Sequence, residues 1–143
     1  MNTCNSCSPE SSRDVGSVFE NYVARRMKEN GAVILEMNYA ARRGEIDIIA
    51  LKGGTVIFVE VKSEKILDPA DKMPEWRIDR RKAEALYTAA RAYTMKLRAE
   101  GIDPEELKFR FDAASVLFDD SLRPVKFRYY ENFLILNDEI AIL

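Results

Sequence analysis

Residues 44–62 read GEIDIIALKGGTVIFVEVK, in which two runs of β-branched and apolar residues flank a Gly-Gly pair. A Gly-Gly pair between two such runs predicts a β-hairpin with a two-residue turn. If the turn closes symmetrically, Asp47 of the first strand lies directly opposite Glu60 of the second. Since side chains alternate between the faces of a strand, Glu45 and Lys62 fall on the same face as these two carboxylates.

Two carboxylates that face each other in an apolar hairpin repel, and burying their charge costs free energy. A hard divalent cation such as Mg²⁺ or Mn²⁺ would compensate them, because it binds carboxylate, water and phosphate oxygens. Such an ion lowers the pKa of a bound water molecule, and an amine beside it can orient that water for attack on phosphorus. Asp47, Glu60 and Lys62 are therefore predicted to form a phosphodiester-cleaving site, with the two carboxylates as metal ligands.

A simpler interpretation is that Asp47 and Glu60 line a solvated face of the sheet, with Glu45 and Lys62 as an ordinary cross-strand ion pair. The opposite face is expected to hold Ile46, Ile48, Ile57, Val59 and Val61, while Ile49, Val56 and Phe58 share the charged face. Both faces are thus expected to be at least partly buried. This favours the site, since unpaired charges are seldom buried.

The flanking sequence supplies helices and further strands. We expect a helix over 15–30, a short strand over 32–37, an exposed loop over 63–76, a helix from about 74 or 79 to 98, and strands over 108–118 and 125–136. The long helix between the third and fourth strands implies a parallel pair with a right-handed crossover, whereas the first three strands form an antiparallel meander. The predicted fold is α/β, a mixed central sheet flanked by helices.

Composition limits the chemistry. With 143 residues the chain is expected to form one domain over 15–143, and a net charge of −2 lacks the basic excess of a general nucleic-acid coat. The chain has no histidine, which excludes Ser-His and Cys-His nucleophile pairs and an imidazole base. No apolar run approaches the ~20 residues of a membrane helix and the N-terminal stretch is polar, so we expect a cytoplasmic protein without a membrane partner.

Cys4 and Cys7 form a lone CxxC motif at the N-terminus. A structural zinc site needs about four ligands, and no other cysteine or histidine is present. Residues 1–14 are therefore expected to be a disordered tail with two reduced thiols. A partner-binding protein organised by this tail is a further hypothesis with only the tail to support it.

Asp47, then twelve residues, then Glu60-Val61-Lys62 resembles the D...ExK core of the restriction-endonuclease-like, PD-(D/E)XK, nucleases. More closely, the chain resembles the YraN-like family of small bacterial proteins. The resemblance covers about residues 16–113 and rests on Gly16, Glu20, Ala24, Gly31, Asn38, GEIDII at 44–49, FVEVK at 58–62, Lys82, Ala90 and RFD at 110–112.

The resemblance implies an αβββαβ core in which Asp47 and Glu60 bind the metal and Lys62 is the catalytic lysine. It also implies that Glu20 is an acidic helix residue reaching the site as a further metal ligand, as in Holliday junction resolvase relatives. On the residues alone a second role for Glu20 is equally open, because 17–20 fits the S-x-x-E capping box of a helix start.

Basic residues gather near the start of the second predicted helix. Arg77, Arg80, Arg81 and Lys82 would bind phosphates there, or they form a solvated face; Arg42 and Arg43 are a weaker case. Trp76 could stack on a base. Asp112 is either a third acidic neighbour of the site or a strand-end group.

These features predict a Mg²⁺- or Mn²⁺-dependent nuclease acting on DNA, including branched or damaged structures. The alternative is a nucleic-acid-binding module that keeps the nuclease fold with little or no turnover. The acidic charge balance favours this alternative, as does 63–64, Ser-Glu, where a basic residue commonly follows the family's lysine. A homodimer would fit two-strand incision, although no residue in the sequence indicates one.

Overall fold

The computed structural model describes residues 12–73, 76 and 78–134. Its elements are α1 (Ser12–Glu29), β1 (Val33–Ala41), β2 (Gly44–Lys52), β3 (Thr55–Lys65), α2 (Arg80–Ala99), a 3-10 turn η1 (Pro104–Glu106), β4 (Lys108–Phe118) and β5 (Pro124–Tyr130). This order contains the expected αβββαβ core followed by one more strand, so the predicted fold is confirmed.

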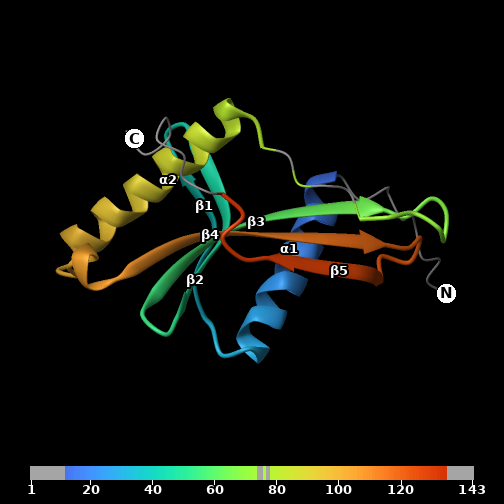
Figure 1. The fold of residues 1–143 in the computed structure, drawn as a ribbon, viewed down its shortest axis with the longest axis horizontal. Helices are drawn as coiled ribbons and strands as arrows, with labels where there is room; N and C mark the ends of the chain where they lie inside the picture. The colour runs from blue at the N-terminus through green and yellow to red at the C-terminus, as the bar shows by residue number, and fades with distance from the viewer. Residues whose placement is uncertain (1–11, 74–75, 77, 135–143) are drawn as a thin grey trace, which may run out of the picture.

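The strands form one five-stranded sheet in the order β1-β2-β3-β4-β5. The β3–β4 pair is parallel and the other pairs are antiparallel, as the position of α2 between β3 and β4 predicted. The sheet is strongly twisted, so its edge strands β1 and β5 run in clearly different directions (Figure 1).

The central hairpin has the register that its turn predicts. Lys52 pairs with Thr55, and the pairs continue to Ile48 with Val59. Gly53 and Gly54 have φ of 55° and 77°, the left-handed conformations that a two-residue hairpin turn requires. The regular pairing ends one step before Asp47 and Glu60.

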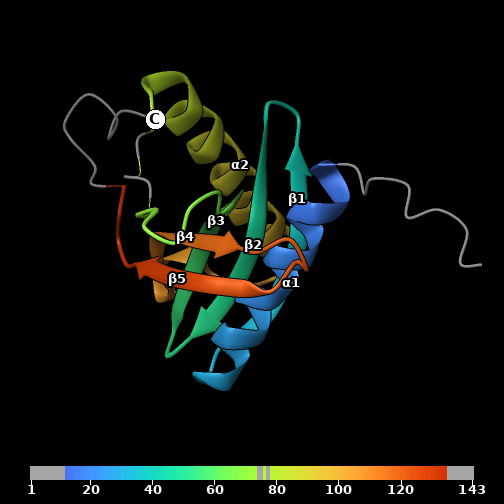
Figure 2. The same cartoon turned by 90° about the vertical axis from the view of Figure 1, so that its right-hand side faces the viewer.

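Each face of the sheet is covered by one helix (Figure 2). The α1 side packs Phe19 and Val23 against Ile48 and Val59, among others, while the α2 side packs Leu86, Tyr93 and their neighbours against Ile49, Val56 and Phe58. Burial of both faces of the hairpin is therefore confirmed.

One face assignment was wrong. Ile46 was expected beside Ile48, but it packs into the α2-side cluster while Ile48 packs into the α1-side cluster. The regular pairing of β1 with β2 skips Asp47 and its neighbour Asn38, and Asn38 has φ of 52°. Because of this break, Ile46 on one side of Asp47 and Ile48 on the other side point to opposite faces of the sheet. Alternation of residue types along the sequence does not reveal such a break.

Several boundaries differ from expectation. The helix α1 already includes residues 12–14, and β1 extends to Ala41 because its pairing with β2 resumes after Asn38 and continues to Ala41 with Gly44. The last strand ends at Tyr130, where a turn follows and the Asn132 N–H donates to a side chain of β4. The CxxC motif and the rest of 1–11 lie outside the described residues, as does Arg77. Neither helix in the described part of the chain is long and apolar enough to cross a membrane.

Candidate active site

Asp47 lies where the regular pairing of the hairpin ends. Its Oδ2 accepts a hydrogen bond of 2.8 Å from the backbone N–H of Val61 on β3. A side-chain oxygen thus takes the position of a strand partner, which holds the carboxylate against the strand that carries Glu60. The predicted proximity of the two acids is seen in their electrostatics, because repulsion by Asp47 helps to raise the pKa of Glu60.

Glu20 reaches the same place from α1. The helix begins at Ser12, so Ser17 lies inside it and the capping-box interpretation of Glu20 is wrong. The Glu20 carboxyl instead hydrogen-bonds the side chains of Asn38 and Asp47. The bond to Asp47 raises the pKa of Glu20 and lowers that of Asp47, so Glu20 holds the proton and donates it.

Glu60 is largely enclosed, with 14% of its side chain exposed. Its Oε1 lies 3.2 Å from Lys82 Nζ of α2. Its Oε2 is buried and has no hydrogen-bond partner among the described residues. An orphaned carboxylate oxygen of this kind costs free energy unless something else binds it.

Gly44 allows α2 to approach the hairpin and so brings Lys82 to Glu60. A Cβ at this position would lie 2.2 Å from the backbone oxygen of Ala85, closer than any side-chain carbon can come. The helix is fixed at its start by Asp79, whose Oδ1 accepts a 2.8 Å hydrogen bond from Lys82 N. The sequence singled out Gly44 only as part of GEIDII; its packing role depends on a contact distant in sequence.

The cluster of Glu20, Asp47 and Glu60 contains more negative charge than its surroundings compensate. Burial, together with repulsion by Asp47, raises the pKa of Glu20 and of Glu60 to about 7 each. Burial also raises the pKa of Asp47. Glu45 adds further repulsion on Glu20 and Asp47, while Lys82 is the cation that lowers the pKa values of Asp47 and Glu60. The site therefore has the electrostatics of a cation-binding position.

Lys62, two residues after Glu60 on β3, forms its ion pair outside the acidic cluster. Its side chain is 45% exposed, and its Nζ is 3.4 Å from Glu64 Oε1. Within the described residues that ion pair replaces the one expected with Glu45. The structure thus brings Lys82, rather than Lys62, into contact with Glu60, a result that strand alternation cannot indicate.

The chemistry of the three carboxyl groups fits Mg²⁺ or Mn²⁺, which prefer oxygen ligands. The unpartnered Glu60 Oε2 supports this fit. In the part of the chain that the structure describes, however, no three acidic or cysteine side chains are already arranged around one point as a coordination shell. Since Lys82 contacts Oε1, Oε2 is the oxygen of Glu60 that lacks a partner among the described residues and that an ion would satisfy.

Two other residues predicted to contact nucleic acid, Arg81 and Trp76, differ in how exposed they are. Arg81 is exposed at the start of α2, and its neighbour Arg80 pairs with Glu84 at 3.2 Å. The Trp76 indole N–H donates to the buried Ser115 hydroxyl, and its ring packs against Phe133, so the ring is already engaged.

Asp112 does not belong to the acidic cluster. It pairs in register with Val59, whose side chain faces α1, whereas Glu60 faces α2. Its carboxylate is fully buried and binds Arg110. Neither role foreseen for Asp112 is correct, because it lies inside β4 and its partners are Arg110 of the same strand, Tyr129 of β5 and Asn132 of the turn after β5.

The sequence model of the uncharacterised protein family UPF0102 matches residues 19–116. The chain belongs to UPF0102. The matched part of this UPF0102 protein runs from α1 into β4 and contains all three carboxyl residues of the cluster. Membership also confirms the resemblance to the YraN-like family.

Similar UPF0102 proteins occur in distant bacteria. One from Dictyoglomus thermophilum is 32% identical over 120 residues, covering 84% of this chain and 96% of that protein. One from Pseudomonas aeruginosa is 31% identical over 123 residues, covering 86% and 94%, respectively. One from Clostridium botulinum is 34% identical over 107 residues, covering 75% and 82%. The similarity therefore extends over most of each protein, not over the hairpin alone.

Proposed function

We propose that this UPF0102 protein is a metal-dependent nuclease that hydrolyses phosphodiester bonds of DNA. The observation that carries the proposal is the cluster of Glu20, Asp47 and Glu60, with an orphaned buried oxygen and pKa values of about 7 for both glutamates. A cluster of this kind is costly to the folded protein, and a divalent cation would compensate it.

Asp47 and Glu60 would hold Mg²⁺ or Mn²⁺, with Glu20 as the third carboxyl group. When bound, the ion would polarise the phosphoryl group and acidify a bound water molecule. The protein's own contribution begins with Asp47, whose orientation is fixed by the Val61 N–H. Glu20 carries the proton of its hydrogen bond to Asp47, so it would have to release that proton before it could join the ligands of the ion.

Two lysines would contact the phosphate group of the substrate. Lys82 would leave Glu60 Oε1 and neutralise charge on a non-bridging phosphate oxygen. Lys62 would have to leave Glu64 to act as the catalytic lysine, and its half-exposed side chain is free enough to do so. Arg81, exposed on the same helix as Lys82, would contact the backbone of the substrate further along the strand.

The proposed substrate is DNA, with branched or damaged structures preferred, as the likeness to Holliday junction resolvases suggests. A homodimer would supply two sites for incision of both strands.

The test is to incubate the purified protein with single-stranded, duplex and four-way-junction DNA in the presence of Mg²⁺ or Mn²⁺. Asp47→Asn, Glu60→Gln and Lys62→Ala should each lower the cleavage rate by about 100-fold or more. Glu106→Gln, which changes an exposed carboxylate of η1, is the matched control and should cleave like the wild type. Equal cleavage by every variant would indicate a contaminating nuclease and refute the assignment.

A nucleic-acid-binding module without turnover is the second candidate. It is favoured by the contact of Lys62 with Glu64 instead of the acidic cluster, and by the absence, among the described residues, of three side chains already arranged as a coordination shell. DNA binding that is unchanged in Asp47→Asn, with no cleavage by the wild type in either metal, would establish this candidate over the enzyme.

A further inference from the structure

A cavity of about 390 Å³ opens on the α1 side of the sheet. Its polar and charged lining residues are Arg26, Asn30, Lys52, Arg110, Tyr129 and Glu131, and its apolar ones are Met27, Ala32, Ile57 and Phe127. None of its lining residues belongs to the acidic cluster. Ile57 and Tyr129 both pack with the α1-side core, so the cavity lies on that face of the sheet, whereas Glu60 of the acidic cluster contacts α2.

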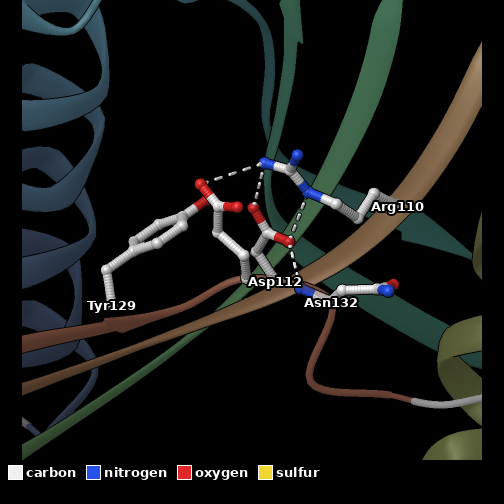
Figure 3. A network of polar contacts seen from close by, with 5 residues as sticks. Arg110, Asp112, Tyr129 and Asn132 are labelled. Carbon is white, nitrogen blue, oxygen red and sulfur yellow. Dashed lines mark hydrogen bonds and ion pairs between the residues drawn. The ribbon is translucent and has the colours of Figure 1, made fainter.

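One wall of the cavity is the guanidinium group of Arg110, which two hydrogen bonds hold in place. Arg110 Nε and Nη2 donate to Asp112 Oδ1 and Oδ2, respectively, each at 2.8 Å (Figure 3). The same carboxylate accepts a 2.6 Å hydrogen bond from the Tyr129 hydroxyl and a 2.8 Å one from Asn132 N. With Asp112 fully buried and satisfied by four donors, Arg110 is fixed before any ligand arrives.

Two further cations come from other elements. Arg26 of α1 places its guanidinium carbon 5.0 Å from the centre of the Phe127 ring, and Lys52 stands at the end of β2. Among the described residues, the negative charges beside these three cations are Glu131 and the fully buried Asp112, which leaves an excess of one positive charge at the cavity in a chain whose net charge is −2. The Glu131 side chain is 70% exposed, and its Oε1 is 3.9 Å from Arg110 Nη2, so it can move aside.

The apolar lining residues suit the face of a planar ring. Met27, Ile57 and the rings of Phe127 and Tyr129 supply apolar surface beside the cations. The volume lies near the lower end of the roughly 300 to 1,000 Å³ of ligand pockets, which suits one nucleotide better than two.

We propose that this cavity binds a nucleoside monophosphate, with the phosphate at Arg26, Lys52 and Arg110 and the base against the apolar wall. Guanidinium and ammonium groups bind phosphate oxygens through charge-assisted hydrogen bonds, and aromatic and aliphatic side chains accept the face of a base. The site does not depend on the acidic cluster. Its test can therefore succeed or fail independently of the test of the proposed nuclease activity.

Titration of the ¹⁵N-labelled full chain with dAMP, deoxyadenosine and inorganic phosphate tests the site. The dAMP should shift backbone amide signals of the residues that line the cavity, and deoxyadenosine and phosphate alone should each bind at least about tenfold more weakly. Arg26→Ala and Lys52→Ala should each weaken dAMP binding by about tenfold, because each removes a charge-assisted contact. Arg25→Ala, which removes an exposed charge of the same helix, should leave the affinity unchanged.

Competition with a single-stranded oligonucleotide identifies the source of the nucleotide. Displacement of dAMP would show that the site binds a nucleotide within a strand. Failure to displace it would show that the site binds free nucleotides. Either outcome supports the proposal. Absence of dAMP binding at millimolar concentration would overturn it. So would an affinity that Arg26→Ala and Lys52→Ala leave unchanged while their thermal unfolding remains like that of the wild type.

Discussion

Among the described residues, Lys82 is the cation that contacts the acidic cluster, and the structure predicts how the free energy of unfolding should respond to Lys82→Met. Glu60 is 14% exposed and keeps one oxygen without a partner even when Lys82 is present. Without the lysine, a mostly buried carboxylate would face Asp47 and Glu20 uncompensated. The free energy of unfolding should therefore fall.

The magnitude follows from the burial of the two partners. Removing one member of a fully buried pair costs about 3–5 kcal/mol, whereas exposed pairs contribute about 0–1 kcal/mol. Glu60 is mostly buried, but the Lys82 side chain is 47% exposed, so we expect a loss of about 1–2 kcal/mol at pH 8. For a domain of this size that corresponds to a Tm lowered by about 5 °C.

Thermal and urea unfolding in EDTA would measure the effect. Lys62→Met is the matched control: it removes a lysine whose pair with Glu64 has both side chains about 45% exposed, and it should cost at most about 0.5 kcal/mol. At pH 5, where Glu60 is protonated, Lys82→Met should approach the stability of the wild type. Mn²⁺ at pH 8 should restore part of the lost stability, because a cation replaces the missing charge.

Equal effects of Lys82→Met and Lys62→Met would refute this reasoning. An effect of Lys82→Met that persists unchanged at pH 5 would refute it as well, since a loss of packing alone would not depend on the charge of Glu60.

Three further outcomes are expected. In EDTA, the free energy of unfolding of the wild type should decrease as the pH rises from about 4.5 to 7. In this range the raised pKa values of Glu20 and Glu60 make the folded protein bind more protons than the unfolded chain does. Urea unfolding of Glu60→Gln should show a weaker dependence on pH. Gly44→Ala should cost about 1–3 kcal/mol in the same assay, because its Cβ would meet the α2 backbone at 2.2 Å, whereas Gly16→Ala, with nothing within 4 Å, should be neutral or stabilising. Asp112→Asn should cost about 3 kcal/mol by leaving Arg110 without its anionic partner, and a loss below about 1 kcal/mol would show that the network contributes little.

The hairpin and its pair of carboxylates could be predicted from the sequence because both depend on local geometry. A two-residue glycine turn fixes the register, and the register fixes which residues lie across from one another. The order of elements was equally accessible, since a long helix between two strands implies a parallel crossover. Residue types and spacing therefore determined the fold and the position of Asp47 beside Glu60.

The rest of the site was decided by contacts between segments distant in the sequence. Glu20 reaches Asp47 because α1 packs across the face of the sheet near the break at Asn38, and Lys82 reaches Glu60 because Gly44 lets α2 approach the hairpin. Periodicity shows which face of a helix is buried, but not where along a strand that face comes to lie. The residues of the hairpin by themselves determined two acids on neighbouring strands, and the family resemblance indicated Glu20 as a third. Only helix packing on a twisted sheet decided that Glu20 hydrogen-bonds Asp47 and that Lys82, rather than Lys62, contacts Glu60.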